Sequence, residues 1–348
     1  TPLDLPLIAL FVLAVISSFS SIEWHAGLHA LMKLANYIIL YFIIVNTIRE
    51  RAQVRRVAYT IMGVGTFLAL FGMVKYLGEL CPPWWDYGSL HKGFSATYGN
   101  HNHLAGYLEM TIPITIGLLI AVRKGWVKAL CGFSLFFLCI ALTLTLSRGG
   151  WISGILALGF MLIVYLIKTK KEYRGIMVVA ISVTTIVVLT VLASTQVTER
   201  LETLTHGEDD PSWKGRTAVA SATLDLIGDY PLLGTGPGTF PIAFTPYRPA
   251  GLNAKYLQAH NDYLHFISET GILTVGIILW LMVATFWSGI RKIMTTNSRL
   301  TLGITLGSLG GIVAIMVHSV SDFNLHLMAN AILFTVLAGL MMAEVKHG

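Results

Sequence analysis

Long apolar windows recur along this sequence, and they constrain its fold more than any other feature. A hydrocarbon core about 30 Å thick requires roughly 17 to 25 apolar residues per spanning helix. Windows of this kind lie at 5–20, 28–48, 56–78, 104–122, 129–147, 151–168, 175–194, 271–290, 300–318 and 327–343. Because 55% of the 348 residues are hydrophobic and only 12% are charged, the chain has too little polar surface for a soluble globule. We therefore predict an all-α, polytopic membrane protein with about ten transmembrane helices.

The distribution of charge predicts how the spans are oriented. Basic residues gather in short loops that fall on one side when the loops alternate, at 49–56, 123–128, 168–174 and 291–299. The positive-inside rule identifies this side as the cytoplasm. The basic residues form no single stripe, so nucleic acid is not an expected partner despite a net charge of +6.

The predicted outer side carries two long loops, 79–103 and 195–270, which also hold most of the acidic residues. We predict one membrane domain over residues 1–348, with these loops forming an outer cap. Because the sequence starts at Thr1 and its first span lacks the form of a signal peptide, we expect a fragment of a longer chain.

The stretch QAHNDYLHFISETGIL, residues 258–273, places several polar side chains just ahead of an apolar span. Asn261 and Asp262 predict a helix start, and His265 and Glu269 are four residues apart, hence on one helix face. His260 is compatible with a helix cap or an interfacial side chain. A histidine that is neutral near pH 7 also suits a general base. We expect His260 to be catalytic, and Asn261 and His265 to contact substrate.

Two arginines are candidates for anion binding. Arg148, in LTLTLSRGGWISG, lies where one predicted span ends and the next begins. It could be a snorkelling side chain, but basic residues are sparse on this outer side, and a guanidinium matches phosphate oxygens. Arg216 lies on a predicted surface helix at 213–228 and is equally compatible with an anion clamp or a solvated polar face. The apolar stripe of that helix comprises Ala218, Val219, Ala222 and Leu226.

The glycine-rich stretch GTGPG at 234–238 leaves two interpretations open. Its backbone amides could cradle a phosphate. Without a preceding strand or a following lysine it is a poor phosphate-binding loop, and a plain tight turn is the alternative.

The first outer loop leads into a span through YGNHNHLAGYLEM. His101 and His103 are two residues apart and point to different sides of a helix, and no other ligand stands at metal-binding spacing. We therefore expect no metal site. Asn100, Asn102 and His103 are predicted to hydrogen-bond a sugar or to shape the cavity.

Three more polar residues are costly to place in lipid. Glu109 lies within the fourth predicted span, and His318 and Asp322 lie at the outer end of the ninth. Such residues normally face a bundle interior or a water-filled cavity. We expect all three to line the same outward-open cleft, with His318 and Asp322 contacting substrate.

Several stretches, taken in order, resemble the O-antigen ligase and O-antigen polymerase superfamily. AHNDYLHFISETGILTVG is similar to the family pattern of His-Asn, nine residues and Gly, with His260, Asn261, Gly271 and Gly276 in register. YGNHNHLAGYL, SRGGWI and DYPLLGTGPGTF look like other parts of the family, and the tail HSVSDFNLH is similar as well. The resemblance runs from about residue 93 to residue 276.

The resemblance implies a metal-independent glycosyltransferase of the multi-helix GT-C fold, without a cofactor, in the bacterial inner membrane. Its donor would be a polyprenyl-pyrophosphate-linked glycan, and its acceptor a glycan, a lipid or a protein on the outer face. In the family an outer-loop histidine is proposed to activate the acceptor hydroxyl and arginines bind the pyrophosphate. These roles map onto His260, Arg148 and Arg216. The family commonly has more spans than the ten predicted here.

Two other functions remain open at this level. A transporter or flippase would carry charge around a central cleft, but it would also show related halves or broken helices with gates on both sides. Here the polar residues gather on one side only. A non-catalytic protein of glycan assembly would tolerate replacement of His260.

Overall fold

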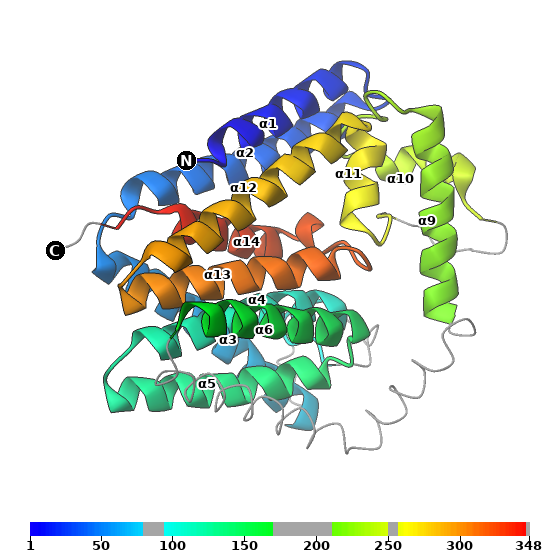
Figure 1. Cartoon of the computed structure of the whole chain (residues 1–348). Coiled ribbons are helices and arrows are strands. Elements are labelled where there is room, and N and C mark those ends of the chain that lie inside the picture. The colour runs from blue at the N-terminus through cyan, green and yellow to red at the C-terminus, as the bar shows by residue number, and fades with distance from the viewer. Residues whose placement is uncertain (79–93, 170–210, 250–256, 346–348) are drawn as a thin grey trace. The chain divides into compact units, whose positions relative to one another are not determined.

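The structure is a computed structural model that describes residues 1–78, 94–169, 211–249 and 257–345 (Figure 1). Every regular element in these ranges is a helix. The contacts within the chain divide it into two compact units. Unit 1 comprises Thr1–Ile43, Thr203–Ser288 and Ser319–His326, and unit 2 comprises Ile44–Glu202, Gly289–His318 and Leu327–Gly348. The prediction of a single membrane domain stays a prediction.

Seven helices of the described residues are long and apolar enough to cross a membrane. They are α2 (Trp24–Thr47), α3 (Arg51–Gly78), α4 (His101–Ala121), α5 (Gly125–Leu144), α6 (Arg148–Lys168), α12 (Leu273–Thr295) and α13 (Arg299–His318). The helices α1 (Asp4–Phe19) and α14 (Met328–Met342) coincide with two further predicted spans, but they have 16 and 15 residues. The predicted span 175–194 lies outside the described residues. The all-α, polytopic class is confirmed, and the count of ten spans stays a prediction.

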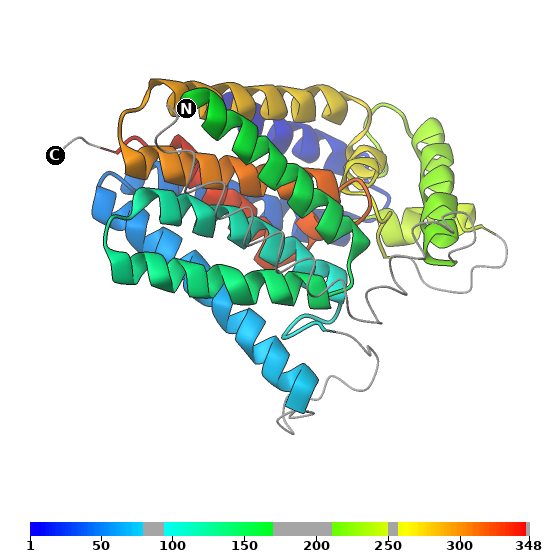
Figure 2. The ribbon, with the colours of Figure 1, turned by 60° about the horizontal axis from the view of Figure 1, so that its bottom comes forward.

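The helices α4 and α13 form the centre of unit 2. Both are apolar on all sides and largely buried, as expected for helices in an interior. Glycines let their backbones approach closely: a Cβ on Gly303 would lie 2.1 Å from the carbonyl oxygen of Gly117, and one on Gly307 would lie 2.6 Å from that of Pro113. The helices α5 and α14 pack against α4, and α6 runs across α13 (Figure 2).

Unit 1 contains the helix predicted at 213–228, observed as α9 (Pro211–Asp229). It ends shortly before Pro231, as expected. Of its predicted apolar stripe, Val219, Ala222 and Leu226 are buried. They form a small core with Phe240, Ala243, Phe244 and Ala259.

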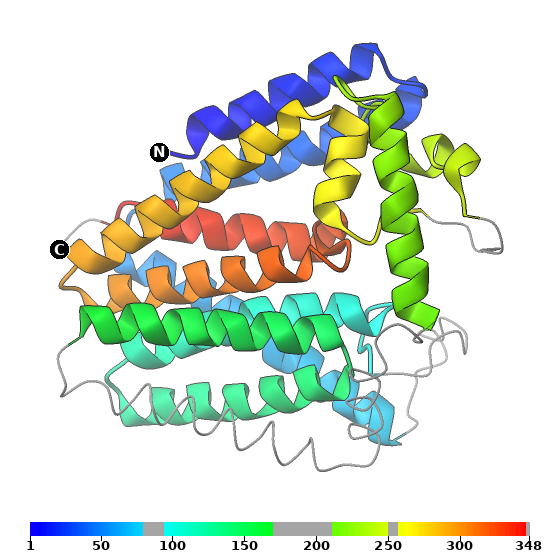
Figure 3. The same ribbon diagram turned by 45° about the vertical axis from the view of Figure 1, so that its right-hand side comes forward.

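Short elements surround this core. They are α10 (Phe240–Ala243), η4 (Thr245–Tyr247), α11 (Asp262–Thr270) and η5 (Asn324–His326). Figure 3 shows α11 beside α9, and the two helices are in contact. Because Ala259 belongs to the small core and directly precedes His260, the core anchors the loop that carries this histidine.

The glycine-rich turn at 234–238 is hydrogen-bonded to the end of α11. Gly234, Gly236 and Gly238 have φ angles of 66°, 101° and 73°, a region that side chains disfavour. The N–H groups of Thr235 and Gly236 donate hydrogen bonds of 3.0 and 2.9 Å to carbonyl oxygens at the end of α11. Since these amides are occupied by the protein itself, the tight-turn interpretation is confirmed.

Candidate functional site

His260 lies immediately before α11, in an unusual backbone conformation. Asn261 is the N-cap of that helix, and its Oδ1 accepts a hydrogen bond of 3.0 Å from the N–H of Leu264, which confirms the predicted helix start. His260 has a φ of 51°, in the left-handed region that residues other than glycine rarely adopt. Such strain persists only where surrounding contacts enforce it, and it concentrates at functional sites.

Asp322 connects two of the predicted catalytic residues. Its Oδ1 lies 3.6 Å from Nδ1 of His260, and its Oδ2 lies 3.6 Å from Nη2 of Arg216. Arg216 also donates a hydrogen bond of 2.6 Å from Nη1 to the carbonyl oxygen of Ser321. The Asp322 side chain is 1% exposed, whereas those of His260 and Arg216 are 27% and 26% exposed. The structure therefore brings together a buried carboxylate, an accessible imidazole and an accessible guanidinium.

This arrangement has the parts of a general-base site. A distance of 3.6 Å is longer than a formed hydrogen bond, and catalytic hydrogen bonds are often long before substrate binds. A carboxylate beside Nδ1 orients an imidazole and stabilises the imidazolium that forms when Nε2 takes a proton. The ring of Phe323 meets that of His260 edge to face, with centroids 5.1 Å apart, and holds it from another direction.

His265 lies inside unit 1, with its side chain 4% exposed. Its Nδ1 accepts a hydrogen bond from the N–H of Ala259 at 3.3 Å, so Nε2 carries the proton and donates to Glu269 at 3.2 Å. This confirms that His265 and Glu269 share a face of α11. Burial lowers the pKa of His265, and the neighbouring His326 lowers it further. His265 is therefore a neutral group that fixes α11, and its predicted contact with substrate stays a prediction.

The pKa of Glu269 has the complementary shift. Burial alone would raise it, but the adjacent His265 lowers it, so the net shift is downward. The carboxylate also accepts a hydrogen bond of 3.0 Å from the N–H of Phe240. Glu269 thus ties the end of α11 to the start of α10.

Asp262 and His326 are partners that the sequence did not predict. His326 donates from Nδ1 to Oδ1 of Asp262 at 2.6 Å. Although burial lowers the pKa of His326, the hydrogen bond and the charge of Asp262 raise it above its ordinary value. A signal for this pair was present, because His326 ends the stretch HSVSDFNLH and Asp262 follows His260 and Asn261. Nothing in their spacing showed that the two stretches meet.

Glu109 and His318 lie together inside unit 2, as expected for polar residues within spans. Nδ1 of His318 is 3.1 and 3.0 Å from the two carboxylate oxygens of Glu109. Ser153 of α6, which was not predicted, donates a hydrogen bond to the same carboxylate. All three side chains are buried, so they join α4, α6 and α13 through one polar cluster. That these residues line a substrate cleft stays a prediction.

Three further predicted residues of unit 2 lie at the start of α4. Oδ1 of Asn100, the N-cap, accepts a hydrogen bond of 2.8 Å from the N–H of Asn102. His103 is buried, and its carbonyl oxygen accepts a hydrogen bond of 3.0 Å from Nδ2 of Asn330. Their contact with a sugar stays a prediction.

Arg148 is the first residue of α6, at the junction of two spans where it was expected. Ser147 caps the helix by accepting a hydrogen bond of 3.3 Å from the N–H of Gly150, and Leu146 before it has a φ of 54°. A positive side chain at a helix N-terminus is disfavoured by the helix dipole. An anion bound there is favoured by the helix dipole and by the positive side chain. Arg148 belongs to unit 2, and its convergence with His260 and Arg216 of unit 1 stays a prediction.

Residues 133–281 match the family model described as O-antigen ligase. This match covers less than half of the chain, and it supports a similarity to the O-antigen ligase superfamily. No curated protein matches it. The match confirms the resemblance seen in the sequence, and together with the seven long apolar helices it supports a membrane protein with a glycan-transferring function. The matched residues include Arg148, Arg216 and His260, whereas Glu109 and Asp322 lie outside the match.

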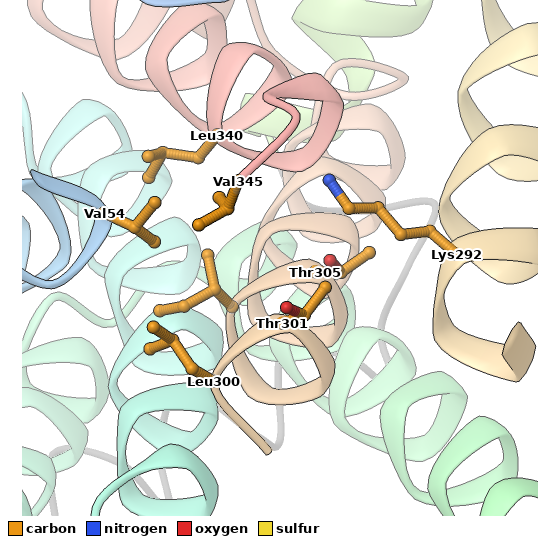
Figure 4. Close-up of a pocket in the computed structure, with 8 residues that line it drawn as sticks. Val54, Lys292, Leu300, Thr301, Thr305, Leu340 and Val345 are labelled. Atoms are coloured by element: carbon orange, nitrogen blue, oxygen red, sulfur yellow. The ribbon is translucent and has the colours of Figure 1, made fainter. Parts of the chain in front are cut away.

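A small pocket in unit 2 contains none of the predicted site residues. Its free volume of about 10 Å³ is roughly that of one water molecule. Figure 4 shows Lys292 of α12 at its edge, next to the end of α14. Lys292 donates hydrogen bonds of 2.8 and 2.7 Å to the carbonyl oxygens of Met341 and Ala343, so it caps that helix. The described residues contain no group of three side chains that could hold a metal ion.

Proposed function

We propose that this protein is a metal-independent glycosyltransferase of the O-antigen ligase superfamily. It moves a glycan from a polyprenyl-pyrophosphate donor to an acceptor hydroxyl on the outer face of the bacterial inner membrane, in a GT-C-like fold. The observation that carries the proposal is the buried Asp322 carboxylate, which lies 3.6 Å from both His260 and Arg216. A base and an anion-binding cation beside one carboxylate are what a transfer between a hydroxyl and a pyrophosphate ester requires.

In the proposed mechanism His260 activates the acceptor. Nδ1 faces Asp322, so proton abstraction is assigned to Nε2. The acceptor oxygen forms a bond to the anomeric carbon of the donor glycan as its proton passes to Nε2. The negative charge of Asp322 stabilises the imidazolium produced.

The arginines act on the leaving group. As the anomeric carbon–oxygen bond breaks, negative charge develops on the pyrophosphate, and guanidinium groups stabilise it without a metal ion. The guanidinium of Arg216 has five N–H donors. Its Nη1 donates to the carbonyl oxygen of Ser321, and its Nη2 faces the carboxylate of Asp322. Arg148, at the N-terminus of α6, is proposed as the second cation. The products are a glycosylated acceptor and polyprenyl pyrophosphate.

The proposal is tested by comparing turnover with donor binding in nanodiscs that contain lipid-linked glycan. His260→Ala is expected to lower single-turnover transfer about 10²- to 10⁴-fold, the usual contribution of a positioned general base, with donor affinity nearly unchanged. Arg148→Ala and Arg216→Ala are expected to weaken donor binding as well as turnover, because each contact forms in the ground state too. Arg148→Lys should also be impaired, since an ammonium lacks the planar fork.

Two exposed residues of unit 1 provide matched controls. His29→Ala removes an exposed imidazole of α2, and Lys214→Ala removes an exposed cation of α9. Both variants are expected to keep wild-type turnover and donor affinity. A His260→Ala protein that transfers glycan at the wild-type rate would exclude the histidine as base. It would favour a transporter or a non-catalytic assembly protein.

A further inference from the structure

We propose that Asp262 and His326 form a positioning pair that holds His260 against Asp322. The inference rests on the proposed function, in which His260 is the base. It assigns neither Asp262 nor His326 a contact with the reacting atoms. The two residues are instead inferred to set the distance between the imidazole and its carboxylate.

Asp262 is a buried carboxylate of unit 1 that accepts hydrogen bonds from three partners. Its Oδ2 accepts hydrogen bonds from the hydroxyl of Ser319 at 2.7 Å and from the N–H of Leu325 at 3.0 Å, and its Oδ1 accepts one from His326 at 2.6 Å. Its own N–H donates to the carbonyl oxygen of Ser319 at 2.9 Å. Asp262 is therefore hydrogen-bonded to both ends of the segment Ser319–His326.

That segment carries the groups that face His260. Asp322 and Phe323 lie between the two points where Asp262 holds the chain. Asn261 adds a third tie, because its Nδ2 donates a hydrogen bond of 2.9 Å to the carbonyl oxygen of Val320. With Asn261 and Asp262 both bound to the segment, the preceding His260 is held in its left-handed conformation beside Asp322.

Helix capping does not account for the carboxylate of Asp262. Asn261 already supplies the N-cap of α11, and the side chain of Asp262 is 1% exposed and bonded to His326. A buried ion pair is seldom the most stabilising choice compared with apolar residues, but it specifies one geometry. This pair therefore fits a need for position at the neighbouring histidine.

His326 cannot shift easily to accommodate a change. Its ring stacks on Phe266 with centroids 4.9 Å apart, and it meets the ring of His265 at 3.9 Å. His265 is fixed in turn by Glu269. The rings of Phe266 and His265 thus hold the His326 imidazole, which donates to Asp262, as expected for side chains that position a catalytic group.

The test measures turnover and donor affinity separately, because a positioning residue affects only turnover. It uses the purified full chain in nanodiscs that contain lipid-linked glycan. Asp262→Asn and His326→Ala are expected to lower turnover about 10²-fold, the effect of displacing a reacting group by about 1 Å, with donor affinity within about twofold of wild type. His326→Asn should recover most of the turnover, because its amide nitrogen stands near the place of Nδ1. The exposed His29→Ala provides the control.

A double-mutant cycle excludes a general loss of fold. If the pair acts only through His260, then His326→Ala should cause no further loss of turnover in the His260→Ala protein. The inference is overturned if His326→Ala keeps wild-type turnover, if His326→Asn is as impaired as His326→Ala, or if the losses add in the double mutant. These outcomes leave the proposed function intact as long as His260→Ala alone lowers turnover about 10²- to 10⁴-fold, so the two failures are distinguishable.

Discussion

Replacing Asp322 with asparagine removes the charge beside His260 while keeping the size of the side chain. If the carboxylate stabilises the imidazolium of the transition state, Asp322→Asn should lower turnover. It should not weaken donor binding, because the guanidinium of Arg216, 3.6 Å away, loses a competing anion. Turnover and donor affinity are therefore expected to diverge, with affinity unchanged or higher.

The separation of the two groups gives the size of the effect. Two unit charges 3.6 Å apart attract each other by about 1 kcal/mol in bulk water and by about 5 kcal/mol at an effective dielectric of 20. These limits correspond to roughly a 10-fold and a 10³-fold change in rate. Because the His260 side chain is 27% exposed and that of Asp322 is 1% exposed, the site lies between the limits. We expect a loss of about 10²-fold.

The assay is single-turnover transfer combined with equilibrium binding of the lipid-linked donor. Asp225→Asn, which removes an exposed carboxylate from α9, is the matched control and should behave as wild type. Wild-type turnover in Asp322→Asn would refute the electrostatic role of the carboxylate. A parallel loss of donor affinity would instead make Asp322 a structural support for Arg216.

Two further predictions concern stability. Glu109→Ala should lower the free energy of unfolding by about 3–5 kcal/mol, because it removes the carboxylate that the buried side chains of His318 and Ser153 contact. The melting temperature should therefore fall further in Glu109→Ala than in Glu109→Gln, and an equal fall in the two variants would contradict this expectation. The raised pKa of His326 gives stability that is complete below its unfolded value of 6.5 and is lost as pH rises through the folded pKa. The difference in melting temperature between wild type and Asp262→Asn should therefore narrow as the pH rises above 6.5, and a constant or widening difference would show that the pair is not ionic.

Features that depend on near neighbours could be predicted from the sequence. The cap at Asn261, the shared face of His265 and Glu269 and the apolar stripe of α9 all follow from helix periodicity over a few residues. The tight turn at 234–238 follows from its glycines. Spans follow from the length of apolar windows, and the short α1 and α14 fall at the limit of that rule.

Pairings between distant segments could not be predicted. Asp262 and His326 are 64 residues apart, and Ser153 and Glu109 are 44 residues apart. Periodicity shows which face of a helix is polar, but it does not show which other element meets that face. The site was therefore predicted as a set of chemically suitable residues. Its connection through Asp322 was found only in the structure.

Transfer of a glycan from a lipid-linked donor to a hydroxyl without a metal ion is the reaction proposed for this chain. It is tested most directly by counting both products made by purified protein in nanodiscs with EDTA present. We expect one polyprenyl pyrophosphate to be released for each glycan joined to the acceptor, and His260→Ala to suppress both equally. Release of pyrophosphate lipid without glycan joined, or activity that returns only when magnesium or manganese is added, would contradict it.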